Sequence, residues 1–231
     1  MDLCLLSGGA AFGLLNGVKG EFEARNGCRI GGEFGAVGLM KEKLLAGEPC
    51  DVIILSRKLI DQLSQAGKLL EGSVRDLGVV GTGVAVIAED EPPPVADDAS
   101  FAKALLSASG IYVPDMSQST AGIHMKKVFE QLDVFEKIKD KVHEYPNGAT
   151  AMKAMASAAV PWSLGCTQIT EIMYTAGVAL VAPLPQSCAL DTVYTIGIPK
   201  TSRQAVLAST LIDVLCDESL DGFKRNNGLS K

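Results

Sequence analysis

Hydrophobic and polar positions follow each other along the chain in short blocks, and each block predicts one element. Apolar runs at 3–6 and 51–55 have the length and residue types of buried strands. Small or polar residues follow each run, and then a segment begins in which apolar residues recur every three or four positions. That spacing is typical of an amphipathic helix, and it predicts helices at 11–26, 39–46 and 58–66, with a further strand at 28–32. Strands alternating with helices indicate an α/β fold with a mostly parallel sheet flanked by helices.

The second half of the chain repeats this alternation after one long extended segment. Residues 78–88, GVVGTGVAVIA, are too rich in glycine for a stable helix and predict a long strand. An acidic, proline-rich surface loop follows at 89–98. The polar tail after Phe223 is expected to fray. The remaining predicted elements are helices at 101–108, 133–142, 151–159 and 202–216 and strands at 111–113, 177–183 and 192–198.

Two such series suggest two lobes. The extended segment at 78–88 would carry the chain from one lobe to the other, and the strand at 192–198 would bring it back. We therefore expect lobe 1 to comprise residues 1–80 plus 192–231 and lobe 2 to comprise residues 81–191. Two lobes joined by two strands can close around a ligand.

Composition narrows the classes of partner. The chain has 231 residues, 47% of them hydrophobic, and a net charge of -6 without a basic block, so nucleic acid is not an expected partner. No segment reaches the ~20 apolar residues of a membrane span. The six cysteines and two histidines form neither CxxC pairs nor a metal-like cluster, and there is no Walker loop, so no metal and no cofactor is expected.

The start of the chain bears on localisation. Met1 and Asp2 lead directly into CLLSGG, without a basic region or a long apolar stretch. This predicts a cytoplasmic protein. If a signal segment has been removed, the prediction becomes a periplasmic protein that delivers its ligand to an ABC importer.

The candidate ligand residues lie where predicted strands end and helices begin. Ligands of doubly wound sheets bind beyond the carboxyl ends of the strands, and a helix N-terminus attracts anions through its unpaired N–H groups. The stretch 113–125, VPDMSQSTAGIHM, is the clearest example. We expect a small anion, a tricarboxylate or an oxyanion, to bind in a cleft between the lobes. The candidate substrate-binding residues are Ser7, Gly8, Gly9, Gly35, Ala36, Val37, Ser56, Ser119, Thr120, Ala121, Asn147, Thr150, Thr167 and Gln168.

Several of these positions also have a plainer, purely structural interpretation. The glycines after Ser7 suit an ordinary strand-to-helix turn, and Ser56 suits a helix cap. Asn147 and Thr150 fit a β-turn followed by an N-cap.

Two ionisable residues are candidates for proton transfer. His124 follows the loop of the 113–125 stretch, where a histidine could bind a carboxylate or move a proton, although a histidine there can also be a packed or surface residue. Glu171, in GCTQITEI, is a carboxylate in an apolar neighbourhood, where burial would raise its pKa and suit it as a base. The alternative is a structural carboxylate near a helix start. Arg57 directly follows a strand end and is a candidate partner for a ligand carboxylate.

Four segments carry a resemblance to a known family. LLSGGAAFGLL, GAVGLMKEKLLAGEPCDVIILS, PNGATAMKAMA and GVALVAPLP resemble the molybdate-binding-like branch of the type II periplasmic binding proteins, over residues 3–215. The resemblance implies two α/β lobes, a two-strand hinge and a ligand in the cleft. Molybdate binders generally have a serine where this chain has Ala36 and Val37. Through STAGIH, PNGATAM and GCTQITEI the chain is more similar to a sub-branch associated with aconitate isomerase, which moves a double bond within an unsaturated tricarboxylate.

Two functions of different classes follow. The first is a cofactor-independent isomerase that shifts the double bond of a small polycarboxylate by allylic proton transfer, with Glu171 or His124 as the catalytic residue. The second is a solute-binding or sensing protein for a small oxyanion, such as molybdate, or a carboxylate, without chemistry.

Overall fold

The computed structural model describes residues 2–231. Met1, the first residue of the predicted lobe 1, lies outside the described residues. The chain divides into two compact units, unit 1 with Met1–Val80 and Thr192–Lys231, and unit 2 with Gly81–Asp191. Two strand segments connect them along the chain. Strand β4 (Arg75–Ile87) runs from unit 1 into unit 2, and β9 (Asp191–Gly197) leads back. Across residues 2–231, no helix has the length and apolar character needed to cross a membrane.

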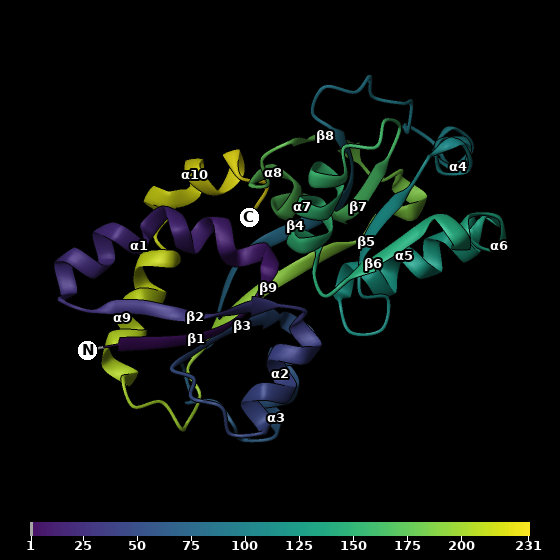
Figure 1. Ribbon diagram of the computed structural model, residues 1–231. Helices are drawn as coiled ribbons and strands as arrows, with labels where there is room; N and C mark the ends of the chain where they lie inside the picture. Colours follow the sequence, from purple (N-terminus) through teal and green to yellow (C-terminus); the bar gives the residue numbers. More distant parts are fainter. Residues whose placement is uncertain (1) are drawn as a thin grey trace. The chain divides into compact units, whose positions relative to one another are not determined.

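Unit 1 is built on a sheet whose first three strands are parallel. The strand order is β2-β1-β3-β9-β4 (Figure 1). Ser7 of β1 lies beside Phe34 of β2 and Ile54 of β3, and β9 runs antiparallel to β3. The carboxyl ends of β1, β2 and β3 therefore meet at one edge of the sheet. The bounds are Asp2–Gly8 for β1, Arg29–Gly35 for β2 and Val52–Ser56 for β3.

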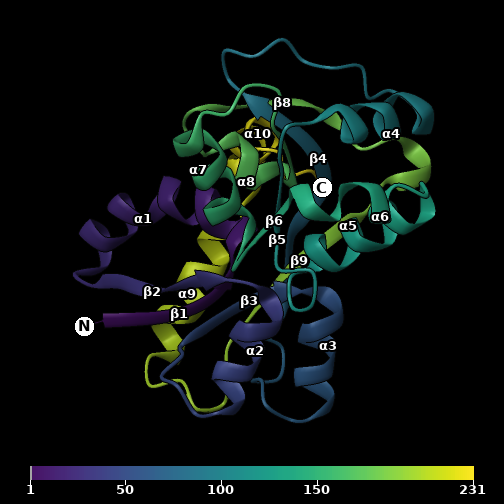
Figure 2. The same cartoon turned by 45° about the vertical axis from the view of Figure 1, so that its right-hand side comes forward.

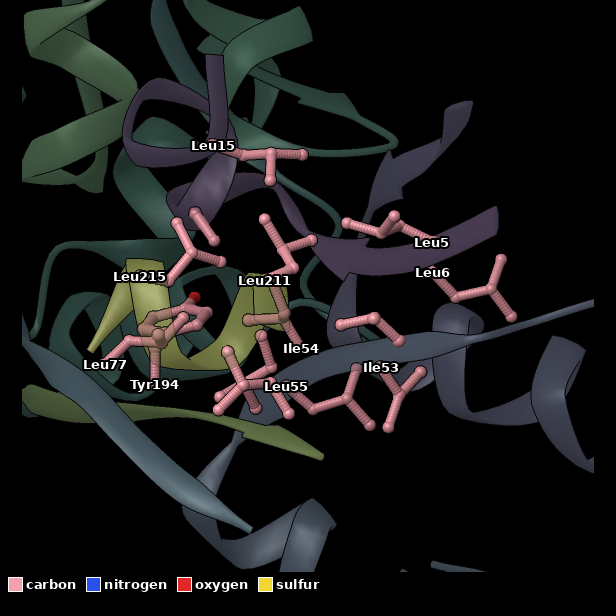
Figure 3. Packing of buried hydrophobic residues seen from close by; sticks show 14 of the residues in the cluster. Leu5, Leu6, Leu15, Ile53, Ile54, Leu55, Leu77, Tyr194, Leu211 and Leu215 are labelled. Carbon is pink, nitrogen blue, oxygen red and sulfur yellow. The ribbon is translucent and has the colours of Figure 1, made fainter. Parts of the chain in front are cut away.

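Helices cover both faces of this sheet because side chains alternate along each strand. On one face of the sheet, Leu5 and Ile54 point toward Leu15 of α1 and Leu211 of α9, and all four side chains are buried (Figure 3). The other face packs against α2 and α3 through Met40 and other apolar residues. The helices of unit 1 are α1 (Phe12–Asn26), α2 (Val37–Leu45), α3 (Arg57–Gln65), α9 (Ala205–Leu215) and α10 (Asp221–Asn226), with the 3-10 turns η1 (Gly9–Ala11) and η4 (Glu218–Leu220).

Unit 2 has a second sheet, in which the strand order is β4-β7-β5-β6 and β8 pairs with β4. Strands β4, β5, β6 and β8 are labelled in Figure 2. Strand β5 is parallel to β6 and to β7, whereas β4 is antiparallel to β7 and β8. The bounds are Ile111–Pro114 for β5, Val142–Tyr145 for β6, Leu164–Gln168 for β7 and Val178–Pro183 for β8.

Two apolar clusters lie on the opposite faces of this second sheet. Val113 packs with Phe101 of α4 and Phe129 of α5, whereas the neighbouring Tyr112 packs with Met152 of α7. The alternation along β5 thus assigns α4 and α5 to one face and α7 to the other. The helices are α4 (Asp98–Ser107), α5 (Thr120–Gln131), α6 (Phe135–Ile138), α7 (Gly148–Ala158) and α8 (Ile169–Met173), with the 3-10 turns η2 (Lys139–Lys141) and η3 (Gln186–Cys188).

Two local predictions are wrong. The predicted helix 133–142 cannot begin at Asp133, which has a left-handed backbone (φ 53), and its last residue belongs to β6. The tail after Phe223 does not fray. It forms α10 and then a bridge in which the Val79 N–H donates to the Ser230 carbonyl at 2.7 Å, while Leu229 is buried. The first error arises because α5 ends locally in a left-handed residue at Asp133, and the second because the tail pairs with Val79, which is distant in the sequence.

Candidate ligand site

Three helices of unit 1 begin directly at the carboxyl ends of adjacent parallel strands. Gly8 ends β1 and precedes η1 and α1, Ala36 follows β2 and precedes α2, and Ser56 ends β3 and precedes α3. The residues are brought together by the sheet, since Gly8 lies beside Gly35 in the register of β1 and β2. The N–H groups of all three helix starts therefore belong to one edge of unit 1.

These three N-cap positions share one backbone conformation. Their φ and ψ angles are -60 and 141 for Gly8, -62 and 133 for Ala36, and -64 and 148 for Ser56. Gly8 and Ala36 have no side-chain oxygen that could cap a helix, and within residues 2–231 the Ser56 side chain makes no capping hydrogen bond to α3. A helix N-terminus carries roughly half a positive charge on N–H groups that need partners. The edge thus presents three helix starts that have no side-chain cap.

The side chains at this edge leave little room and few hydroxyls. A Cβ atom at Gly8 would lie 2.7 Å from Val37, so glycine is needed for the close approach of β1 to α2. The fully buried Ser7 hydroxyl donates to the Gly8 carbonyl at 3.0 Å. Arg57 pairs with Asp76 of β4 and with Asp61, so its charge is already engaged by protein carboxylates.

In unit 2 the corresponding helix starts are capped by their own side chains. Ser119 Oγ accepts the Gly122 N–H of α5 at 3.5 Å. Asn147 Oδ1 accepts both the Thr150 N–H of α7, at 2.9 Å, and the Thr150 hydroxyl, at 3.0 Å. This is the N-cap geometry that the plainer interpretation of Asn147 and Thr150 describes. Thr120 and Ala121 occupy the first turn of α5, where Thr120 is half-buried and Ala121 is buried.

Glu171 is the most unusual ionisable residue of unit 2. It is only 4% exposed, and Thr167 at the end of β7 donates its hydroxyl to Glu171 Oε2 at 2.6 Å. The carboxyl also accepts the backbone N–H groups of Gly148 and Ala149, the first residues of α7, and that of Gln168. Glu171 therefore sits at the N-terminus of α7, where a bound anion would otherwise be expected.

Burial decides the protonation of this carboxyl. Desolvation raises the pKa of Glu171 from 4.5 to about 7, while the hydrogen bonds from Thr167 and from the backbone lower it in part. A carboxyl with this pKa exchanges its proton near neutral pH, which suits a general acid or base. The same contacts also describe a structural carboxylate that satisfies the start of α7.

His124 lies on α5, four residues after Thr120. Its Nε2 is 2.7 Å from the Cys188 carbonyl oxygen of η3. A carbonyl oxygen can only accept, so Nε2 carries the proton, and in the neutral ring Nδ1 is the nitrogen that accepts one. His124 is thus held by its own unit, with one ring nitrogen left to take up a proton.

The structure divides the predicted set between the two units. Unit 1 brings together Ser7, Gly8, Gly9, Gly35, Ala36, Val37 and Ser56 at one sheet edge, and unit 2 gathers Asn147, Thr167, Gln168 and Glu171 around the start of α7. The donors Gly148 and Ala149 were not predicted as partners of Glu171. No local signal reveals them, because 22 or more residues separate them from Glu171.

Comparison with known proteins identifies the class of protein. The family model of the bacterial extracellular solute-binding proteins matches residues 3–229, and the chain belongs to that family. The chain is also similar, at 22% identity over 98% of its length and 87% of the relative, to an aconitate isomerase from a Pseudomonas species.

Solved structures support the same fold. A periplasmic molybdate-binding protein from Azotobacter vinelandii has a TM-score of 0.81 and 18% identity over 99% of both chains. The sulfate-binding protein SubI of Mycobacterium tuberculosis has a TM-score of 0.75 and 15% identity, over 99% of this chain and 86% of its own. The predicted α/β fold of the periplasmic-binding-protein type is confirmed.

Proposed function

We propose that the protein binds a small, oxygen-rich anion through the helix starts of unit 1. The observation that carries the proposal is the set of three N-cap positions, Gly8, Ala36 and Ser56, with one shared conformation and no side-chain cap in the described chain. N–H groups aimed at one place by neighbouring strand ends are an anion site that needs no net positive charge. This explains how a chain with a net charge of -6 binds an anion.

The side chains favour a carboxylate ligand over a tetrahedral oxyanion. Ala36 and Val37 offer no hydroxyl, and the Ser7 hydroxyl is used by the Gly8 carbonyl, which leaves Ser56 as the hydroxyl of this set. A polycarboxylate can instead place one planar carboxylate at each helix start. The likeness to an aconitate isomerase supports a tricarboxylate.

A panel of ligands tests this choice. Ligand binding to the folded state raises stability by RT ln(1 + [L]/Kd), roughly 2.7 kcal/mol at a hundredfold excess over Kd. We expect citrate and trans-aconitate to raise the melting temperature more than molybdate or sulfate at equal concentration and ionic strength. A larger shift with molybdate would assign the protein to the oxyanion binders.

The extracellular description of the family favours the periplasmic alternative over a cytoplasmic location. In that case the bound anion would be delivered to an ABC importer. Fractionation of cells that express the full gene, with blotting for this chain, distinguishes the two locations.

Isomerisation is the second candidate function, and Glu171 is the observation that favours it. A carboxyl with a pKa of about 7 can remove a proton from the carbon next to a conjugated double bond and supply one at the far carbon of that double bond. The double bond then moves by one position, and no electrons are gained or lost. His124 is the alternative proton carrier, through Nδ1. A positioned general base contributes typically 10²–10⁴-fold to the rate.

Proton NMR of cis-aconitate in deuterated water tests the chemistry directly. An isomerase produces the trans isomer and incorporates deuterium, and Glu171→Gln or His124→Gln lowers turnover by about 10²–10⁴-fold, according to which residue is the base. Glu130→Gln, at an exposed position of α5, serves as the matched control. Binding without isomerisation or deuterium uptake would leave the protein a solute-binding protein.

A further inference from the structure

Unit 2 contains a cavity of about 220 Å³ at the amino end of β7, beside the loop that follows β4. Its lining includes Trp162, Ser163 and Leu164 from the start of β7 and Asp90 and Glu91 from the loop after β4. Leu164 begins β7 and Gln168 ends it, so roughly 13 Å of strand separates the cavity from the cluster around Glu171. The cavity is therefore distinct from the candidate sites described above.

The loop at Trp162 is held in an unfavourable conformation with its ring in solvent. Trp162 has φ 65, which bulky side chains rarely adopt, and it is 62% exposed. Its N–H donates to Asp90 Oδ2 at 2.8 Å, and its carbonyl accepts the Ser109 N–H at 3.1 Å. The two hydrogen bonds fix the backbone, but the exposed indole gains too little burial to offset the conformational cost of the left-handed backbone. Trp162 is one of the residues that line the cavity.

Ser163 supplies an independent sign of a ligand. It lines the cavity, is fully buried, and its hydroxyl has no hydrogen-bond partner anywhere in residues 2–231. A buried hydroxyl without a partner is costly, so native structures usually provide one. A polar group of a molecule in the cavity would satisfy it.

The charges of the lining select the kind of ligand. Asp90 and Glu91 are acidic, and the lining residues of the described chain include no lysine or arginine. An indole face attracts cations, above all alkylated ammonium groups, and the apolar side chains of Val86 and Leu164 suit the carbon substituents. We propose that this cavity is a second binding site, which takes a small alkylammonium compound with the cation between Trp162 and the two carboxylates.

The protein carries its own reporter, because Trp162 is its only tryptophan. Titration with choline chloride, followed by tryptophan fluorescence, is expected to give a saturable change. Sodium chloride at equal ionic strength and 3,3-dimethyl-1-butanol, the uncharged analogue of choline, are expected to give none. An equal change with the uncharged analogue, or no saturation with choline, would overturn the proposal.

Variants separate recognition from simple quenching. Asp90→Asn keeps an oxygen for the Trp162 N–H but removes the charge, and Glu91→Gln removes the second charge. The double variant is expected to raise the Kd for choline about tenfold or more, whereas Glu130→Gln, at an exposed position of α5, leaves it unchanged. Ser163→Ala is expected to weaken choline binding while raising the melting temperature of the free protein. An unchanged Kd in the double variant, with the fold intact by circular dichroism, would contradict the assignment.

Discussion

Glu171 shows how one buried side chain couples protonation to stability. Its carboxyl is surrounded by donors from Thr167 and the start of α7, yet burial outweighs them and raises its pKa to about 7. A group with a raised pKa in the folded state stabilises the fold below its unfolded pKa, and this contribution is lost as pH rises through the folded pKa. For Glu171 the relevant range is pH 4.5 to about 7.

Glu171→Gln is therefore expected to change the pH dependence of stability. The glutamine does not titrate, so the unfolding free energy of the wild type should fall relative to the variant by about 3 kcal/mol between pH 4.5 and pH 8. Urea unfolding of both proteins across this range measures the difference, in which all other titrating groups cancel. A constant difference would mean that the pKa of Glu171 is not raised.

At the scale of single elements, the two units treat their helix starts differently. The starts of α5 and α7 are capped by Ser119 and Asn147, and α7 also receives the Glu171 carboxyl. The starts of α2 and α3 lack a side-chain cap in the described chain. The fold thus satisfies the first N–H groups of some helices with its own side chains, and we propose that a ligand satisfies those of α2 and α3.

Replacing the N-caps should reveal this difference in the absence of ligand. Asn147→Ala removes two hydrogen bonds at the start of α7 and is expected to cost about 1 kcal/mol. Ser56→Ala, at an N-cap without a capping bond, is the matched control and should cost only a few tenths of a kcal/mol. Equal losses in chemical denaturation would show that Ser56 caps α3 in solution.

The C-terminal segment is a second element whose role is testable. Leu229 is 3% exposed and packs in the core of unit 1, and Ser230 bridges to Val79. Leu229→Ala is expected to cost about 2–5 kcal/mol, whereas Ser230→Ala, which keeps the backbone bridge, should cost under about 0.5 kcal/mol. Thermal unfolding distinguishes them, and a negligible loss for Leu229→Ala would restore the view that the tail frays.

Elements with strong local patterns could be predicted from the sequence, and those that depend on distant partners could not. The β-branched run of β3 and the amphipathic repeat of α9 can be recognised from the sequence alone. Strand β6 is recognisable only by its pairing with β5, and α10 only by the close approach of Phe223 to Gly17 of α1. In the same way, the position of Glu171 against Gly148 and the cavity at Trp162 arise from tertiary packing alone.

At the scale of the whole molecule, family membership supports solute binding, and we propose the unit 1 edge as the place where the solute binds. The chain belongs to the bacterial extracellular solute-binding proteins, and its first three parallel strands deliver three helix starts to one edge. A negatively charged protein can bind an anion there because the attraction is local. The central claim is that the protein binds a small polycarboxylate at this edge.

Calorimetric titration with trans-aconitate of the wild type and of Ser56→Asp tests this claim most directly. Aspartate is a favoured N-cap, so the variant should fold at least as well as the wild type while its carboxylate occupies the start of α3. We predict that the Kd rises about tenfold or more. Gly20→Asp, which adds the same charge at an exposed position of α1, should leave the Kd unchanged. Equal affinity in Ser56→Asp and the wild type, or no binding by either, would contradict the account.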